Sequence, residues 1–151
     1  ALNALENLLK EVLEDLRVVH LYAGDGTVAH RLLNAGASQA VCVEPDPPED
    51  KREAEGMVWI EMDPLDFFSA ERVPDVGLVY TSAPEGTDHN RDVLEQLPGA
   101  KNLVENCLVL IQEPTWSKLL LDNFPQYELI EDLEYSGTRI AVTQMVSAMG
   151  V

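Results

Sequence analysis

The sequence has few basic residues, and this shortage excludes one large class of function. Ten Lys and Arg stand against 27 Asp and Glu, which gives a net charge of -17. Nucleic-acid binding needs a basic surface that displaces counterions from phosphates. The ten cations are instead scattered, and only Lys51 and Arg52 are adjacent. We therefore expect this chain alone to repel RNA, DNA and anionic membranes.

Cysteines and long apolar runs are also scarce. The two cysteines, Cys42 and Cys107, each lie in an apolar, strand-like run, which predicts buried thiols rather than a disulfide or a metal site. No grouping of His, Cys and acids has the spacing of metal ligands, so no metal is expected. No apolar run approaches the ~20 residues of a membrane span, and no basic-then-apolar leader is visible. These features predict a cytoplasmic protein with one domain over residues 1–151.

What the sequence does contain is a regular alternation of helical and strand-like segments, with 46% apolar residues. Apolar residues at helical spacing predict helices at residues 2–16, 27–35, 64–71, 89–97 and 115–124. Short apolar runs predict strands at residues 17–22, 40–44, 57–62, 76–81 and 107–113. Residues 127–146 read as two strands around a Ser-Gly-Thr turn, and the proline-rich connection 45–56 as a loop with one helical turn.

This alternation predicts the fold class. Nearly continuous apolar strands separated by helices indicate a mostly parallel sheet covered on both faces, closed by an antiparallel hairpin. Right-handed crossovers then favour a Rossmann-like, doubly wound α/β fold. Ligands of such folds lie at the carboxyl ends of the strands, where the loop at residues 23–26 is expected.

The stretch "VVHLYAGDGTVAHRLLNAG", residues 18–36, has the pattern of a cofactor-binding turn. Gly24 and Gly26 allow a sharp turn and a close ligand approach, and the helix that follows points its positive end at the site. The third glycine of the dinucleotide fingerprint is absent, which disfavours pyrophosphate binding. Glu44, at the end of the second strand, could accept the hydroxyls of a ribose. Asp63, after the third strand, could meet an adenine edge.

The order "VVHLYAGDG…AGASQAVCVEPDP…EMDPLDFF…VGLVYTSAPE" resembles the class I S-adenosylmethionine (SAM)-dependent methyltransferases. It is most similar to the bacterial methylases that modify a guanine N2 of 16S ribosomal RNA, over about residues 5–145. The resemblance implies a seven-stranded sheet of strand order 3-2-1-4-5-7-6, with SAM as the cofactor.

The resemblance also implies roles for individual residues. Ala23, Gly24 and Gly26 would face the methionine part of SAM, and Glu44 would hold its ribose. Met62 and Asp63 would flank its adenine.

His20 would take the place of the acid that helps to orient the ammonium group. Ser82 and Pro84 would be the catalytic residues of a loop that reads Ser82-Ala83-Pro84-Glu85.

Two of these positions depart from the family pattern. An imidazolium at His20 would oppose the ammonium of SAM, whereas a neutral ring could accept a hydrogen bond. Because the surrounding carboxylates would raise the pKa of His20, we expect SAM affinity to rise between pH 5.5 and 8.5. The amino-methylating families carry Asp or Asn, two prolines and an aromatic residue where this chain has Ser82 to Glu85.

The sequence therefore leaves three functions open. The first is a SAM-dependent methyltransferase that acts on a non-RNA or unknown acceptor. The second is a module that binds SAM without turnover. The third is a catalytically inactive scaffold with the methyltransferase fold.

Overall fold

A seven-stranded sheet in the order β3-β2-β1-β4-β5-β7-β6 organises the protein. The computed structural model describes residues 2–70, 73–117 and 121–146. Strands β1 to β5 run parallel to one another, while β7 pairs antiparallel with β5 and β6. The strands are β1 (Arg17–Leu21), β2 (Gln39–Glu44), β3 (Met57–Glu61), β4 (Val76–Thr81), β5 (Leu103–Pro114), β6 (Tyr127–Tyr135) and β7 (Thr138–Met145). The predicted fold class, strand order and C-terminal hairpin are confirmed.

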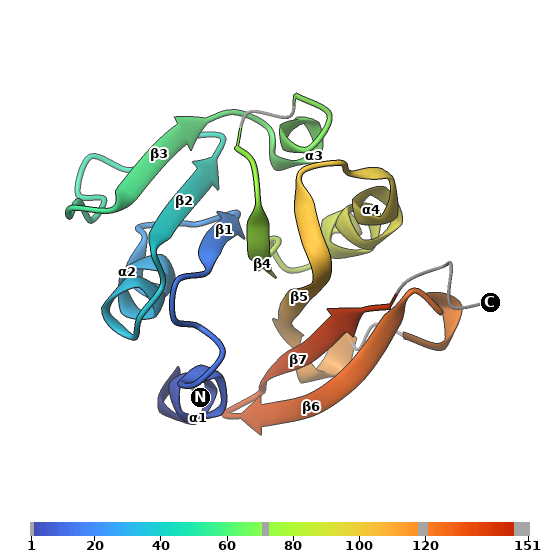
Figure 1. Ribbon diagram of the computed structural model, residues 1–151. Helices are drawn as coiled ribbons and strands as arrows, with labels where there is room; N and C mark the ends of the chain where they lie inside the picture. Colours follow the sequence, from blue (N-terminus) through green and yellow to red (C-terminus); the bar gives the residue numbers. More distant parts are fainter. Residues whose placement is uncertain (1, 71–72, 118–120, 147–151) are drawn as a thin grey trace.

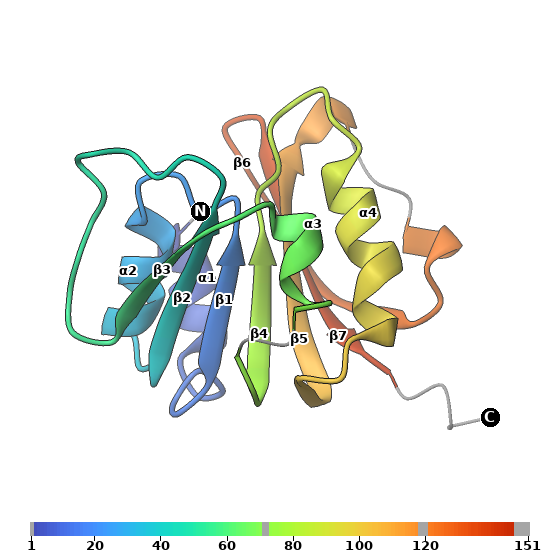
Figure 2. The same ribbon diagram turned by 90° about the horizontal axis from the view of Figure 1, so that it is seen from above.

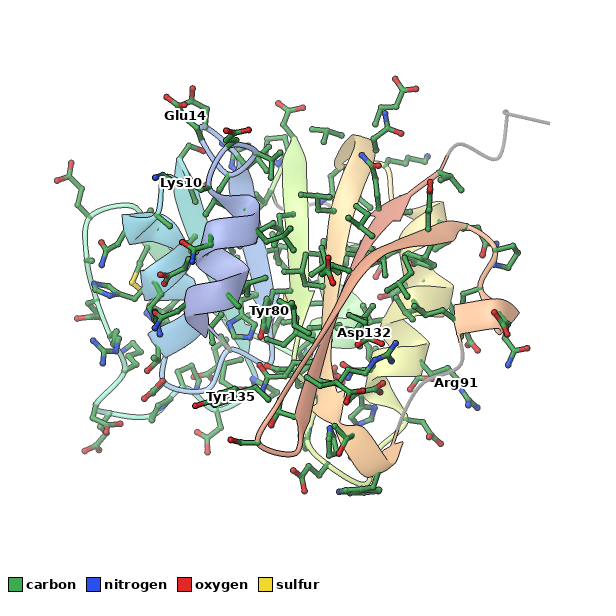
Figure 3. All side chains as sticks on the ribbon, turned by 90° about the horizontal axis from the view of Figure 1, so that it is seen from below. Lys10, Glu14, Tyr80, Arg91, Asp132 and Tyr135 are labelled. Atoms are coloured by element: carbon green, nitrogen blue, oxygen red, sulfur yellow. The ribbon has the colours of Figure 1, made fainter. Side chains whose placement is uncertain are left out.

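Helices cover both faces of this sheet (Figure 1). On one face lie α1 (Leu2–Leu9) and α2 (Thr27–Asn34), and on the other lie α3 (Pro64–Phe67) and α4 (His89–Gln96). Leu5, Leu9 and Leu13 pack with Val18 and Tyr80 on the first face, where Tyr80 lies in the interior beneath α1 (Figure 3). Alternate residues of each strand therefore enter two separate cores, as expected for a sheet buried on both sides.

Several predicted helices are shorter in the structure. The first ends at Leu9 rather than at residue 16, since Asp15 and Leu16 instead form backbone hydrogen bonds with Gly36 and Ser38. The third helix, predicted over residues 64–71, ends at Phe67, and residue 71 lies outside the described part. Competing backbone bonds to neighbouring loops thus override local helical periodicity.

Two further helix predictions are wrong. Residues 45–56 contain turns but no helical turn, since Pro45, Pro47 and Pro48 cannot donate backbone hydrogen bonds. The segment predicted as a helix at 115–124 contains two short 3-10 turns, Thr115–Ser117 and Leu121–Asn123, and residues 118–120 lie outside the description. Thr115 is the first residue of that predicted helix. Its amide instead donates to the carbonyl of Gly137 in the hairpin turn at 2.9 Å.

Buried polar side chains join the hairpin to the parallel sheet. Arg139 on β7 is 3% exposed and donates to Glu113 on β5 at 2.9 Å and to Asp132 on β6 at 2.7 Å. The two cysteines, Cys42 and Cys107, are buried free thiols, as predicted.

Candidate functional site

The carboxyl ends of β1, β2 and β4 meet at one edge of the sheet (Figure 2). The loop after β1, residues 22–26, bends there through three left-handed residues, with φ of 62° at Tyr22, 60° at Gly24 and 87° at Gly26. Backbone amides of Tyr22 and Ala23 donate to the carbonyl of Val43 on β2. This loop is therefore fixed against the neighbouring strand beside Glu44.

The two glycines of the loop have different surroundings. A Cβ added to Gly26 would lie 2.8 Å from the Trp59 side chain of β3, whereas a Cβ added to Gly24 would meet no atom within 4 Å. The left-handed φ favours glycine at both positions, and packing against Trp59 adds a steric reason only at Gly26. The open space beside Gly24 leaves room for a ligand.

Glu44 lies directly against this open turn. Its Oε1 accepts a hydrogen bond from the Gly24 amide at 3.1 Å. Partial burial raises the pKa of Glu44, the Gly24 amide acts in the opposite direction, and Asp46 raises it further. The structure thus brings together Gly24 and Glu44, two residues that sequence reasoning assigned to one cofactor.

His20 is buried in the sheet and is bonded to Ser82. Its ring is 2% exposed, its Nε2 lies 2.9 Å from Ser82 Oγ, and it meets the Tyr80 ring edge-on. Burial lowers the pKa of His20 to about 3. The expected rise in this pKa is therefore wrong, because desolvation outweighs the attraction of distant carboxylates. His20 is neutral throughout the pH range in which SAM affinity was expected to change.

Ser82 connects the loop after β4 to the loop after β1. Its hydroxyl donates to the carbonyl of Tyr22 at 3.0 Å while it contacts His20. The Pro84 carbonyl accepts hydrogen bonds from both the amide and the hydroxyl of Thr87. Of the two predicted catalytic residues, Ser82 adjoins the glycine turn. The carbonyl of Pro84 is instead hydrogen-bonded within its own loop.

The remaining predicted site residues have structural contacts of their own. Asp63 caps α3 by accepting from the Leu65 amide at 2.9 Å, and Met62 packs against the core on the α3 and α4 face. Ala23 is 5% exposed and packs in a small cluster with Ala29 and Cys42.

Tyr22 is a residue of this site that sequence reasoning missed. Its ring stacks on His89, with centroids 5.8 Å apart and planes within 4°. Burial, followed by the charges of Asp63, Asp92 and Glu44, raises the pKa of Tyr22 to about 12. Three carboxylates from separate elements therefore surround one ring, and this part of the edge carries a negative potential. The sequence places Tyr22 in the glycine turn, but it does not show that α3 and α4 approach this side chain.

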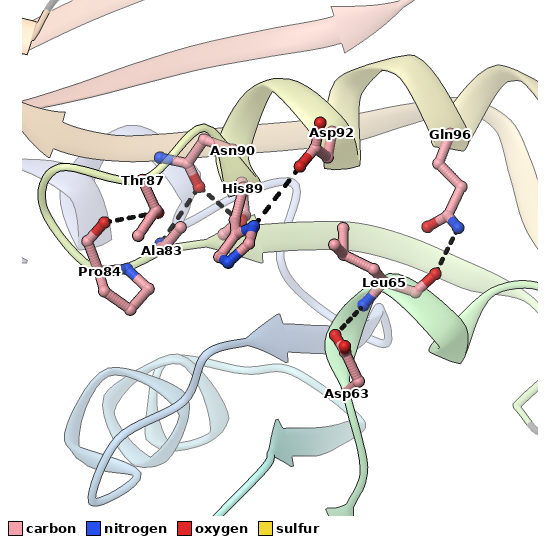
Figure 4. Close-up of polar contacts among 10 residues, drawn as sticks. Asp63, Leu65, Ala83, Pro84, Thr87, His89, Asn90, Asp92 and Gln96 are labelled. Atoms are coloured by element: carbon pink, nitrogen blue, oxygen red, sulfur yellow. Dashed lines mark hydrogen bonds and ion pairs between the residues drawn. The ribbon is translucent and has the colours of Figure 1, made fainter.

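Asn90 was also missed, although it ties three elements together (Figure 4). Its Oδ1 accepts from Thr81 Oγ1 at 2.8 Å and from the Ala83 amide at 3.2 Å, and its Nδ2 donates to the Gln112 carbonyl at 3.0 Å. These bonds fix the ends of β4 and β5 to α4. A polar residue on the otherwise apolar face of a predicted helix was the only signal for this role.

The start of α2 is occupied by the protein itself. Asp25 Oδ1 accepts from the amide and the hydroxyl of Thr27, and these bonds lower the pKa of Asp25. The Arg52 amide donates to the Asp25 carbonyl at 2.8 Å. Asp25 therefore satisfies one of the amides at the start of this helix.

The described residues include no helix long and apolar enough to cross a membrane. Within residues 2–70, 73–117 and 121–146, no group of three or more His, Cys, Asp or Glu side chains could hold a metal ion.

Comparison with known proteins gives structural relatives only. No protein-family model and no curated protein sequence matches this chain. Among solved structures, a candidate methyltransferase from Escherichia coli (yhhF) has a TM-score of 0.83 at 16% identity, over 96% of this chain and 84% of that one. A candidate RNA methyltransferase from Pyrococcus horikoshii has a TM-score of 0.67 at 17% identity, over 97% and 83%.

A third relative, a candidate methyltransferase solved in complex with S-adenosylhomocysteine (SAH), has a TM-score of 0.72 at 11% identity. It matches 94% of this chain and 48% of its own length. At these identities the likeness concerns the fold. The chain has the Rossmann-like fold of the class I SAM-dependent methyltransferases.

Proposed function

We propose that this protein is a SAM-dependent methyltransferase that binds its cofactor at the carboxyl edge of β1 and β2. The observation that carries this proposal is the Glu44 carboxylate at the end of β2, 3.1 Å from the amide of the open Gly24 turn. A carboxylate at this place in a doubly wound fold can accept ribose hydroxyls. The fold it shares with methyltransferases, one of them solved with SAH, supports the same choice.

The charges at this edge are complementary to those of SAM. Its sulfonium and ammonium groups are cationic, and the carboxylates of Glu44, Asp63 and Asp92 provide a complementary potential around Tyr22. The hydroxyl of Tyr22 is buried without a hydrogen-bond partner in the described part of the chain. We assign Ala23, Gly24 and Gly26 to the methionine side, with Met62 and Asp63 beside the adenine.

When bound, SAM supplies an electrophilic methyl group, and the protein has to hold the acceptor nucleophile in line with it. In this proposal Glu44 fixes the ribose and the Gly24 turn fixes the methionine side. His20 holds Ser82 in place from behind, and the loop from Ser82 to Pro84 borders the acceptor. His20 thus acts on this loop as a neutral, buried group rather than by facing the cofactor's ammonium.

The acceptor in this proposal is not RNA. One structural relative is described as a candidate RNA methyltransferase, but this chain has a net charge of -17. Glu85 replaces the aromatic residue expected on the loop after β4 and would repel phosphate.

A second function, SAM binding without turnover, is favoured by one observation. The Ser82 hydroxyl already contacts both His20 and the Tyr22 carbonyl, so it has little capacity left to hold an amine acceptor. The proposal therefore has a binding part and a catalytic part, which need separate measurements.

Thermal unfolding with added SAM, followed by an assay for SAH formation, tests the two parts. Binding predicts a melting temperature that rises with SAM concentration, equivalent to about 2.7 kcal/mol at a hundred times Kd. SAH formation that depends on an added amine acceptor supports the enzyme. Stabilisation without SAH formation across amine acceptors supports the binding module, and no stabilisation by either SAM or SAH indicates the inactive scaffold.

A further inference from the structure

A small cavity lies between the loop after β4 and the end of β5. Its volume is about 240 Å³, and its wall includes residues 83–88 together with Glu113 and Trp116. Pockets for drug-sized ligands occupy about 300–1,000 Å³. This cavity is therefore suited to a single functional group of side-chain size.

Buried hydrogen bonds hold the floor of this cavity. Asn90, which is 8% exposed, joins the Ala83 amide on one wall to the Gln112 carbonyl beside the other. Glu113 is 7% exposed and is bonded to the buried guanidinium of Arg139. A cavity whose walls are fixed in this way loses little entropy when a ligand enters it.

An exposed indole forms part of the cavity wall. Trp116 is 70% exposed although it is one of the most apolar side chains of the protein. The face of an indole attracts cations through its quadrupole, and guanidinium groups stack on it well.

Two free carboxylates line the same cavity. Glu85 and Asp88 are both exposed, and neither side chain has a hydrogen-bond or ion-pair partner among the residues that the structure describes. Arg91, also on the wall, extends from α4 toward solvent (Figure 3) and opposes a cationic ligand.

We propose that this cavity binds an alkylammonium or alkylguanidinium group and that this group belongs to the methyl acceptor. The second part rests on the proposed methyltransferase function. The indole of Trp116 would cover the cation, and Glu85 and Asp88 would balance its charge. The loop that carries Glu85 begins at Ser82, so a bound acceptor would reach from this cavity toward the Gly24 turn.

Calorimetric titration without SAM tests the cavity directly, with butylguanidinium and butylammonium as cationic probes and 1-butanol as the neutral probe. We expect the cations to bind and the alcohol to give no binding heat. Glu85→Gln should weaken cation binding about tenfold, and Trp116→Leu about three- to fivefold. Arg91→Gln should tighten it, because a repelling charge is lost.

The matched control is Glu55→Gln, which removes the same charge from an exposed position on the β2–β3 connection and should leave cation binding unchanged. Equal binding of 1-butanol, or equal weakening by Glu55→Gln and Glu85→Gln, would overturn the proposal. A short arginine- or lysine-containing peptide, compared with the free cations, shows whether the group comes from a protein or from a small molecule.

The test is independent of the proposed methyltransferase function, because no SAM is present. Cation binding without any SAM binding would support the cavity assignment and reject the cofactor. SAM binding without cation binding would support the cofactor assignment and reject the cavity assignment.

Discussion

His20 and Ser82 form a buried polar contact where the sequence predicts a cofactor contact. The imidazole is neutral because its burial makes protonation costly. Its Nδ1 has no hydrogen-bond partner among the described residues, so the Nε2 contact with Ser82 is its polar anchor. The side chain thus links the ends of β1 and β4 at the point where the strand order changes direction.

This buried histidine predicts a pH-dependent stability. The pKa of His20 is about 3 in the folded protein and about 6.5 when unfolded. The unfolded chain therefore binds one more proton between these values, and stability falls as the pH decreases through this window. Urea unfolding should show a loss of about 2 kcal/mol from this group between pH 7 and pH 5.

The His20→Gln variant provides the comparison, since it removes the titrating group and keeps a polar side chain. Its stability should change by about 2 kcal/mol less than that of the parent over the same pH range. Parallel pH profiles for the two proteins would show that His20 is protonated normally in the fold.

Gly24 and Gly26 give a matched pair of substitutions within one turn. Gly24→Ala meets no nearby atom and should cost about 1–2 kcal/mol for its left-handed φ. Gly26→Ala adds a contact 2.8 Å from Trp59, and overpacking of this kind costs about 1–3 kcal/mol more. Urea unfolding of both variants measures the difference, and equal losses would exclude a role for Trp59 in the choice of glycine.

Among the elements, the strands followed from the sequence more reliably than the helices. Apolar runs such as 40–44 and 76–81 are found as strands β2 and β4 because both faces of each are buried. The segment at residues 10–16 forms turns instead of the predicted helix, and at its end Asp15 and Leu16 form backbone bonds with residues 36 and 38. Such bonds join residues far apart in the chain, and periodicity within one segment contains no information about them.

Asn90 should be important for how α4 is held against the sheet. Asn90→Leu removes three hydrogen bonds and leaves the Thr81 hydroxyl and the Ala83 amide without their partner. Each buried group left unpaired costs about 1–3 kcal/mol, so we expect a loss of about 2–4 kcal/mol in unfolding free energy.

The exposed Asn34 on α2 serves as the control for this prediction. Asn34→Leu should change stability by no more than about 0.5 kcal/mol, as is usual at the surface. A similarly small effect of Asn90→Leu would mean that water replaces its bonds at no cost.

For the whole molecule, the excess of acidic residues dominates the electrostatics. A net charge of -17 on 151 residues destabilises the compact state through self-repulsion. Salt screens this repulsion, with a Debye length of about 10 Å at 0.1 M. The melting temperature should therefore rise between about 20 and 300 mM NaCl. A falling melting temperature would instead indicate that favourable solvent-accessible ion pairs such as Arg31–Glu6 outweigh the repulsion.

The sequence predicted more of the molecule as a whole than of its site. Strand and helix alternation predicted a doubly wound sheet, and the family resemblance supplied its strand order, which the structure confirms. That Glu44 and Gly24 lie together could be predicted because each ends or follows a strand. The direction of His20 was not predictable, since residues on both faces of β1 are buried and alternation does not distinguish the faces. Tyr22 and Asn90 owe their roles to elements distant in the chain.

The central claim is that SAM binds at the Gly24 turn through Glu44, and titration calorimetry with SAH tests it most directly. The account predicts one SAH per chain for the parent protein. Glu44→Ala should weaken this binding by about 1.5–3 kcal/mol, the range for hydrogen bonds to a charged group. The control Glu128→Ala, which removes an exposed carboxylate from β6, should bind like the parent. Absence of SAH binding to the parent, or equal affinity of the parent and the Glu44→Ala variant, would contradict the account.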